Sequence, residues 1–211
     1  MRLFVTATNT SIGKTVTTLR LIELAASKGL KPGCYKPIET GCVPISHDGS
    51  KLLEKCQEFN ENFRKISIEE IVPYRFPLPA APFVAKKESI DRDLLIQRAS
   101  ELENACDILF IEGAGGLMVP IECDYFMIDL IKDLSSPALL VSPSRLGSIN
   151  DTLLSRTALQ SKGIDYLWYV NLYEDKEDFE AVTAPYYKEC LGEVPTDLAS
   201  VFNRYLHGDF S

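Results

Sequence analysis

Residues 8–15, TNTSIGKT, combine a polar loop with a Gly-Lys-Thr triplet. They stand between a short apolar run and a segment with helical spacing, and a turn in that position surrounds a polyphosphate with backbone N–H groups at the positive end of a helix. In such a loop Lys14 reaches the β- and γ-phosphates and the Thr15 hydroxyl ligates Mg²⁺. The strict P-loop pattern is not met, because the loop opens without its first glycine. The alternative is an ordinary strand-to-helix turn capped by Thr10 or Ser11.

A carboxylate followed by glycines stands at the end of a second apolar run. Residues 108–111 are apolar, and Glu112 leads into Gly-Ala-Gly-Gly at 113–116. A strand that ends in an acid supplies the group that P-loop proteins direct at the metal, and glycines let backbone N–H groups approach an anion closely. Glu112 is therefore a candidate metal ligand. Taken alone, the same pattern also fits a solvated strand end followed by a turn.

A second lysine follows another predicted strand. The strand covers residues 33–36 and ends at Pro37, and the sequence continues as Ile-Glu-Thr-Gly at 38–41. Ligands of open parallel sheets gather outside the carboxyl ends of the strands, so Lys36 is expected near Lys14 and Glu112. There it can neutralise phosphoryl charge or hold a substrate anion. The alternative is a surface lysine at the rim, where the substitution Lys36→Gln would cost little stability.

The elements that position these residues repeat one pattern. Short, continuously apolar runs are each followed by Gly, Pro or Asn and then by a helical segment, which is typical of a parallel sheet buried on both faces. The predicted strands are residues 3–7, 33–36, 108–111, 138–142 and 166–171. The first helix is expected to bury Val16, Leu19, Ile22 and Ala26 and to end at Lys28-Gly29. We expect one α/β domain over residues 1–211, with a P-loop NTPase fold, a mostly parallel sheet and helices on both of its faces.

Two segments fit this pattern less clearly. Residues 73–82 are dense in proline and are expected to be irregular but packed, through Tyr74, Phe76 and Phe83. The tail after Pro195 is expected to form a short helix. Neither segment marks a domain boundary.

Composition excludes several classes of partner. The chain has 211 residues, of which 45% are hydrophobic, and a formal charge of −8. This acidic balance offers no footprint for a nucleic acid, and no apolar window is long enough for a membrane span. The start of the chain reads as a strand rather than a signal peptide, so a cytoplasmic location is expected. The six cysteines form no C-x-x-C pair and are expected to be free thiols.

Four phrases of the sequence resemble the dethiobiotin synthetase family. They are TNTSIGKT at 8–15, YKPIETG at 35–41, EGAGGLMVP at 112–120 and LGSIN at 146–150. The resemblance implies an ATP- and Mg²⁺-dependent ligase of biotin biosynthesis, which carboxylates 7,8-diaminopelargonic acid with CO2 and closes a ureido ring through a carbamic-phosphoric anhydride. The similarity weakens after about residue 172.

The resemblance also implies roles for matching residues. The implied catalytic residues are Lys36 and Lys14, and the implied metal set is Thr15, Asp48 and Glu112. The implied nucleotide contacts are Thr10, Ser11, Ile12, Gly13, Lys14, Thr15, Val16, Asp48, Glu112, Gly113, Ala114, Gly115, Asn171 and Pro195. The implied substrate contacts are Thr40, Gly116, Leu146, Gly147, Ser148, Ile149 and Asn150.

In the family, the last four of these, which begin a helix, come from the partner subunit, which implies a homodimer with the substrate site near its interface. A plain helix N-cap is the alternative interpretation of both Asp48 and Ser148. Three departures from the family pattern stand out: Ala7 replaces a glycine, Ala81 stands where a serine is common, and the tail has no clear match.

Two other functions fit a P-loop. A switch ATPase for positioning or metal insertion usually carries a second lysine early in the loop, and residues 7–11 contain none. A glutamine-dependent amidoligase needs a cysteine–histidine glutaminase domain, for which the chain leaves no room. Dethiobiotin synthesis is therefore the favoured interpretation.

Overall fold

The computed structural model describes residues 1–42, 45–173 and 176–210, which form an α/β fold around a parallel sheet. The strands of this sheet lie in the order β2-β5-β1-β8-β9. Their bounds are β1 Arg2–Ala7, β2 Pro32–Tyr35, β5 Ile108–Gly116, β8 Ala138–Pro143 and β9 Tyr166–Asn171. All neighbouring strands run parallel. The five predicted strands and the predicted fold class are confirmed.

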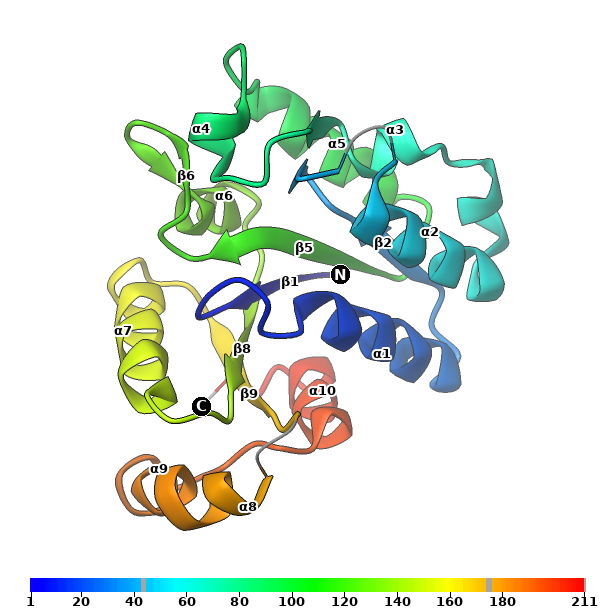
Figure 1. Cartoon of the computed structure of the whole chain (residues 1–211). Coiled ribbons are helices and arrows are strands. Elements are labelled where there is room, and N and C mark those ends of the chain that lie inside the picture. The colour runs from blue at the N-terminus through cyan, green and yellow to red at the C-terminus, as the bar shows by residue number, and fades with distance from the viewer. Residues whose placement is uncertain (43–44, 174–175, 211) are drawn as a thin grey trace.

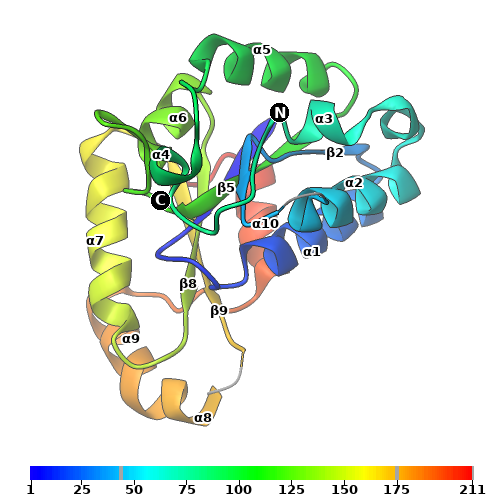
Figure 2. The same cartoon turned by 45° about the horizontal axis from the view of Figure 1, so that its top comes forward.

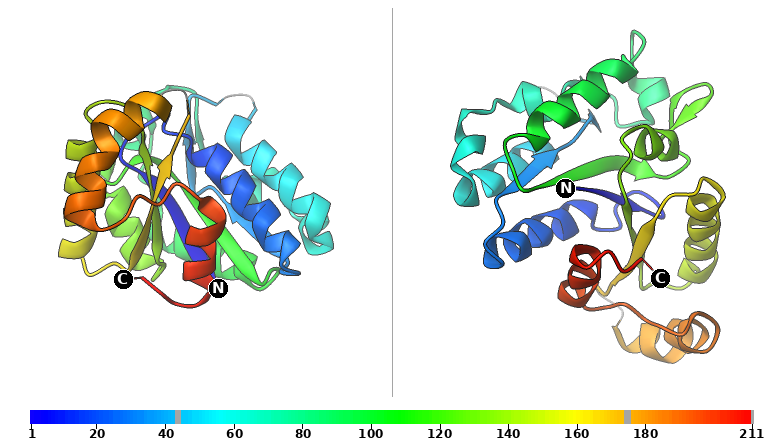
Figure 3. Two further views of the ribbon diagram at one scale, coloured as in Figure 1. Left: turned by 90° about the horizontal axis from the view of Figure 1, so that it is seen from below. Right: turned by 180° about the vertical axis from the view of Figure 1, so that it is seen from behind.

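Helices cover both faces of the sheet (Figures 1 and 3). One face carries α1 Lys14–Ser27, α2 His47–Phe59 and α10 Leu198–Leu206. The other face carries α5 Arg92–Glu103, α6 Met127–Asp133 and α7 Ser148–Ser161. Figure 2 shows α1 and α2 side by side, and their first turns lie at the same end of the sheet, because Thr15 of α1 contacts Glu112 and Asp48 of α2 lies 3.7 Å from Lys36, which also contacts Glu112.

Shorter elements fill the connections. They are β3 Ile38–Thr40, η1 Glu61–Lys65, α3 Ile68–Ile71, β4 Tyr74–Phe76, α4 Pro82–Ala85, β6 Pro120–Glu122, β7 Tyr125–Phe126, α8 Lys176–Asp178, the π-helical η2 Phe179–Thr183 and α9 Ala184–Leu191. β3 pairs with β4 and β6 pairs with β7. No helix in the described part of the chain is long and apolar enough to cross a membrane.

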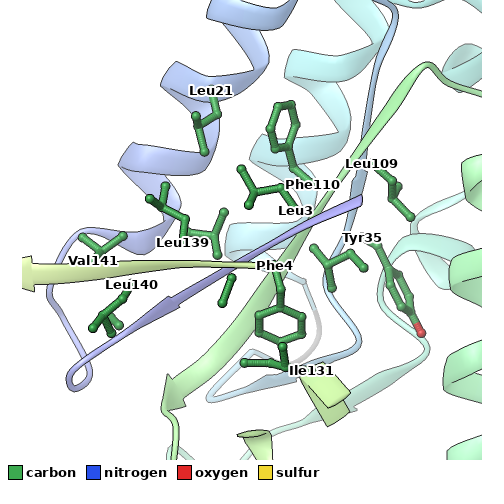
Figure 4. Packing of buried hydrophobic residues seen from close by; sticks show 14 of the residues in the cluster. Leu3, Phe4, Leu21, Tyr35, Leu109, Phe110, Ile131, Leu139, Leu140 and Val141 are labelled. Atoms are coloured by element: carbon green, nitrogen blue, oxygen red, sulfur yellow. The ribbon is translucent and has the colours of Figure 1, made fainter. Parts of the chain in front are cut away.

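The core lies between the central strands and the helices on both faces. Consecutive strand residues point to opposite faces: in Figure 4, Leu3 lies on the side of Leu21 of α1, whereas Phe4 lies on the side of Ile131 of α6. Leu3, Phe4, Leu21 and Ile131 are all fully or almost fully buried. This double-sided burial explains why the strands of the sheet are continuously apolar.

Two sequence-based expectations about local structure are wrong in part. The first helix buries Thr17, Thr18, Leu21 and Ala25 beside the expected Ile22, whereas Val16 is 49% exposed. Its inner face therefore carries hydroxyl groups next to the site, a feature that apolar spacing cannot indicate.

The proline-dense stretch is not wholly irregular. Residues 74–76 form β4, with stacked Tyr74 and Phe76 rings, because this strand pairs with β3. Phe83 lies on α4 and is 40% exposed, so its expected packing is wrong. The predicted tail helix is confirmed as α10, which buries Val201 and Phe202.

Candidate functional site

The loop between β1 and α1 has the backbone conformation of an anion-binding turn. The Thr8 amide donates to the Val141 carbonyl at 3.1 Å, which fixes the loop to β8. Ser11 has a φ of 57° and Gly13 a φ of 94°, both left-handed. Gly13 is the N-cap of α1, and no described side chain caps that helix end. The first N–H groups of α1 are thus left for an anion, and the alternative of a turn capped by Thr10 or Ser11 is wrong.

Asn171, at the end of β9, contacts this loop and stabilises it. Its Nδ2 atom donates to the Ile12 carbonyl at 3.0 Å. A Cβ atom on Gly13 would come within 2.3 Å of the same nitrogen. Gly13 is therefore required both by its positive φ and by the approach of Asn171. Contact of Asn171 with the nucleotide base stays a prediction.

The predicted catalytic and metal-binding residues lie together at this end of the sheet. Glu112 is fully buried, and its Oε1 atom accepts from Lys36 Nζ at 2.6 Å and from the Thr15 hydroxyl at 2.9 Å. Asp48 Oδ2 lies 3.7 Å from Lys36 Nζ, and Lys14 Nζ donates to the Asn9 carbonyl at 3.3 Å. The expected proximity of Lys36 to Glu112 is confirmed, and the alternatives of a rim lysine and a solvated glutamate are wrong.

The two lysines differ in their electrostatic environments. Burial, reinforced by the charge of Lys36 and opposed by Glu112 and Asp48, lowers the pKa of Lys14 to about 8. Burial acts in the same direction on Lys36, but the charges of Glu112 and Asp48 outweigh it and raise the pKa of Lys36 above its usual value. Lys36 thus keeps its proton at neutral pH, whereas Lys14 titrates near pH 8.

The oxygen atoms in this cluster fit Mg²⁺. Mg²⁺ takes hard oxygen ligands and is usually held by one or two carboxylates together with substrate phosphates. Thr15 and Glu112 bring a hydroxyl and a carboxylate within 2.9 Å of each other, and Asp48 adds a carboxylate 3.7 Å from the Lys36 ammonium. The described residues include no group of three or more His, Cys, Asp and Glu that could hold a metal alone, so oxygens of a nucleotide would have to complete the shell.

Two residues of this site were not predicted from the sequence. The Thr18 hydroxyl lies 2.9 Å from Glu112 Oε2 and 2.9 Å from the Lys14 carbonyl. A signal for it exists, since Thr18 stands one helical turn after Lys14 and therefore on the same face.

Glu39, the second of these residues, is buried at the start of α2. Its Oε1 atom accepts from the amides of His47 and Asp48 at 2.9 and 3.0 Å, and its Oε2 atom accepts from the Gly49 amide at 3.1 Å and from the Ser46 hydroxyl. No sequence spacing rule links a strand residue to a helix start at this separation.

The glycines after Glu112 are packed against the loop. A Cβ atom on Gly116 would lie 3.0 Å from the Thr8 carbonyl, and one on Gly115, whose φ is 69°, would lie 3.5 Å from the Thr10 side chain. The β1–β5 register shifts between Val5 and Ala7, where β5 bulges. Gly115 and Gly116 therefore lie next to the loop after β1, whereas Gly113 lies against Phe4 and Met127.

Other predicted residues make no hydrogen bond or ion pair with this cluster in the described part of the chain. Thr40 ends β3, and the Pro195 carbonyl accepts from the Val170 amide at 2.8 Å beside the end of β9. Val16 is exposed in the first turn of α1. Their ligand contacts stay predictions.

The turn before α7 forms a third helix start at the same end of the sheet. Gly147, with a φ of 91°, is its N-cap, and Leu146 before it is 80% exposed. Ser148 is buried, and its Oγ lies 3.4 Å from the Tyr187 hydroxyl. Ser148 is therefore not the cap. Asp48 is not the cap of α2 either, because Ser46 occupies that position and Asp48 lies in the first turn.

Comparison with known proteins agrees with this geometry. The AAA_26 family model, described as an AAA domain, matches residues 1–202. A relative from Sulfurovum sp. (strain NBC37-1), named ATP-dependent dethiobiotin synthetase BioD, is 53% identical over 186 residues, which cover 88% of this chain and 89% of the relative. A relative of the same name from Wolinella succinogenes is 44% identical over 191 residues, covering 89% of this chain and 88% of the relative.

Solved structures agree in fold. A plasmid partition protein from Borrelia burgdorferi gives a TM-score of 0.61 at 11% identity, over 99% of this chain and 98% of the other. The MinC:MinD cell division protein complex of Aquifex aeolicus gives a TM-score of 0.55 at 17% identity, over 96% and 85%. At such identities these matches support the P-loop fold alone. The identities to the two named relatives carry the assignment further: the chain belongs to the family of ATP-dependent dethiobiotin synthetases.

Proposed function

We propose that the chain catalyses the ATP-dependent carboxylation and ring closure of 7,8-diaminopelargonic acid with CO2, giving dethiobiotin, ADP and phosphate. The observation that carries the proposal is the buried Lys36–Glu112–Thr15 cluster beside Lys14 and an uncapped helix start. The names of relatives that align along most of the chain support the same activity.

The proposed reaction joins three bond changes. One amine of the substrate attacks CO2 and loses a proton, which forms an N–C bond and a carbamate. A carbamate oxygen then attacks the γ-phosphorus of ATP, the bond to ADP breaks, and a carbamic-phosphoric anhydride results. The second amine attacks the carbamate carbon and loses a proton, phosphate leaves with its bonding electrons, and the ureido ring closes.

The second bond change requires two anions to meet. A carbamate and a phosphate oxygen about 4 Å apart repel by about 4 kcal/mol at an effective dielectric constant of about 20. Lys36, held cationic by Glu112 and Asp48, offers a fixed positive charge for the carbamate. Lys14 would offer the triphosphate a second charge once it leaves the Asn9 carbonyl. Preorganised charges of this kind stabilise a transition state without reorganisation during the reaction.

A magnesium ion fits the same cluster. Thr15, Asp48 and Glu112 would hold Mg²⁺, and the ion, when bound, would neutralise charge on the phosphate oxygens. The Thr18 hydroxyl and the Lys36 ammonium, which contact Glu112 in the structure, would orient that carboxylate.

We further propose that the active unit is a homodimer, with the substrate carboxylate bound at the start of α7 of a second copy. Uncapped N–H groups at a helix start attract a carboxylate. Leu146 stands just before the Gly147 N-cap of α7, Leu154 lies within α7, and their side chains are 80% and 64% exposed. Large exposed apolar side chains on the segment that carries the proposed carboxylate site are expected of such an interface.

Two broader proposals follow from the same chain. Residues 1–211 are proposed to act as one dethiobiotin synthetase-like domain. All six cysteines are free thiols, as is usual for proteins of a reducing compartment, and we place the reaction in the cytoplasm.

A switch ATPase is not favoured, because residues 7–11 lack the second lysine that such proteins carry.

The purified protein tests the proposal directly. It is incubated with diaminopelargonate, bicarbonate and MgATP, and the products are followed by mass spectrometry and phosphate release. We expect dethiobiotin and phosphate to appear in equal amounts, and omission of the diamine to abolish phosphate release. Phosphate release that ignores the diamine would instead indicate an ATPase.

A further inference from the structure

Asp48 is a proposed metal ligand whose side chain has little to hold it. This side chain is 40% exposed, and its one polar contact in the described part of the chain is Lys36 Nζ at 3.7 Å. A carboxylate placed so loosely must be positioned through its backbone. The backbone around Asp48 is the first turn of α2, so whatever fixes this turn also fixes the ligand.

Glu39 fixes that turn. Its side chain is almost completely buried, and its two oxygens together accept from three consecutive amides, those of residues 47–49, and from the Ser46 hydroxyl. Hydrogen bonds from N–H groups to an ionised carboxylate are among the strong ones, and the positive end of a helix adds to them. One side chain thus satisfies most of the free amides at the start of a 13-residue helix.

Gly49 is adapted to this contact. A Cβ atom at this position would come within 2.2 Å of Val72 Cγ2 and 2.5 Å of Ser46 Oγ. Any side chain would push the turn away from Glu39. β3, which carries Glu39, begins two residues after Lys36, so a single segment places the lysine and the start of α2 relative to each other.

We propose that Glu39 is a positioning residue that holds Asp48 at the metal side of the site. The inference rests on the proposed function, in which Asp48 ligates Mg²⁺. Outer contacts of this kind change metal affinity or activity by roughly 10- to 100-fold when they are removed. The change should appear in the Mg²⁺ requirement more than in turnover at saturating Mg²⁺.

The test compares Glu39→Gln with Glu70→Gln. Glu70 caps the start of α3 by accepting from the Ser67 amide at 2.8 Å, so this control removes a similar contact outside the site. Amide hydrogen exchange of the metal-free protein is measured first. Glu39→Gln should accelerate exchange at residues 47–49 by roughly tenfold, and Glu70→Gln should not. Unchanged exchange at these amides would overturn the proposal.

The second measurement is the rate of dethiobiotin formation against free Mg²⁺ at saturating ATP. Glu39→Gln should raise the half-saturating Mg²⁺ concentration by roughly tenfold or more and should add little when Asp48→Asn is already present. A shift in Asp48→Asn without one in Glu39→Gln would overturn the positioning role and leave the metal set standing. No shift in either variant would remove Asp48 from the metal set, and the positioning role would fall with it.

Ser46→Ala covers the case in which Glu39→Gln does not fold. It removes one of the four hydrogen bonds to Glu39 and leaves the carboxylate in place. We expect a smaller shift in the same direction, in both exchange and Mg²⁺ requirement. No shift in either measurement for a folded Ser46→Ala variant would count against the positioning role of Glu39.

Discussion

Lys14 and Lys36 show how two buried lysines of one site acquire different tasks. Lys36 touches the carboxylate of Glu112 at 2.6 Å, and this partner keeps it charged. Lys14 has a carbonyl as its hydrogen-bond partner and shares its surroundings with another cation. Glu112 and Asp48 only partly offset the burial of Lys14, so a bound triphosphate would add the charge partner that stabilises its ammonium.

This difference predicts a pH dependence of nucleotide binding. The pKa of Lys14 is about 8 in the folded chain, against a usual value of 10.5. Above pH 8, ligand-free Lys14 is neutral, and a bound triphosphate raises its pKa again, so binding takes up a proton. The affinity for MgATP should fall as pH rises through 8, by up to about tenfold per unit. Titration calorimetry in buffers of different ionisation enthalpy measures the proton uptake.

The same shift makes a prediction for stability, with the sign set by the protons bound in each state. Between about pH 8 and 10.5 the unfolded chain keeps a proton on Lys14 that the folded chain has lost. The Lys14 contribution to the free energy of unfolding therefore rises with pH in this window. Lys36, with its raised pKa, does not titrate there. In urea unfolding across this pH range, Lys14→Met should lack the rise in the free energy of unfolding that Lys14 contributes. A pH profile identical to that of the unaltered chain would contradict the lowered pKa of Lys14.

The substitution Lys36→Gln should lower turnover by about two to three orders of magnitude, because it removes a fixed charge from the transition state. The expectation of a small effect on stability needs correction. Lys36 is 4% exposed and paired with a fully buried glutamate, so we expect a loss of about 3 kcal/mol. Single-turnover kinetics with urea unfolding separates the two effects. Turnover near that of the unaltered enzyme would remove Lys36 from the catalytic set.

The site residues that could be predicted from the sequence are those that follow strands. Lys36 and Glu112 come after apolar runs, and the rule that ligands gather at strand ends brings them to the P-loop. Glu39 obeys no such rule, because its partners lie in a helix start seven to ten residues further on. A capping carboxylate at that distance emerges from tertiary packing alone.

At the scale of the elements, long apolar strands could be predicted and short ones could not. β3 has three residues and β7 has two, too few for any periodicity to appear. The predicted inner face of α1 was wrong in part for a different reason: Thr17 and Thr18 are buried on it, and Thr18 contacts the site. Thr18 bonds Glu112, so a functional requirement overrides apolar spacing there.

The docking of α10 gives a prediction for this scale. Phe202 is 1% exposed, and its ring lies 6.0 Å from those of Phe110 and Tyr205. The substitution Phe202→Ala should destabilise the fold by about 3–5 kcal/mol, because the cavity lies between α10 and the sheet. Asn203→Ala, on the exposed side of the same helix, should change stability by less than about 0.5 kcal/mol. Urea unfolding measures both, and equal losses would contradict the docking.

For the whole molecule, sheet order explains why distant sequence phrases share one site. β1 lies between β5 and β8, and β2 lies on the other side of β5. The loop after β1 therefore adjoins the glycines after Glu112, and Lys36, after β2, contacts Glu112 on the neighbouring strand β5. The strands themselves could be predicted from the sequence, but their lateral order could not, since nothing in an apolar run specifies which strand will pair beside it.

The proposed homodimer gives the last prediction. Leu154 is 64% exposed on α7, the helix whose start is the proposed carboxylate site, and Leu154→Asp should place a charge in the proposed interface. We expect a monomer whose KM for diaminopelargonate rises by roughly tenfold or more, because burying an unpaired charge in an interface is costly and the substrate carboxylate would lose its partner-derived site. The Kd for MgATP should stay unchanged, since the P-loop cluster lies within one chain.

Val182→Asp, at a residue that is 57% exposed on η2, is the matched control and should leave both mass and kinetics unaltered. Light scattering after size exclusion, run beside steady-state kinetics, decides the matter, because a monomer with an unchanged KM would place the carboxylate site within a single subunit.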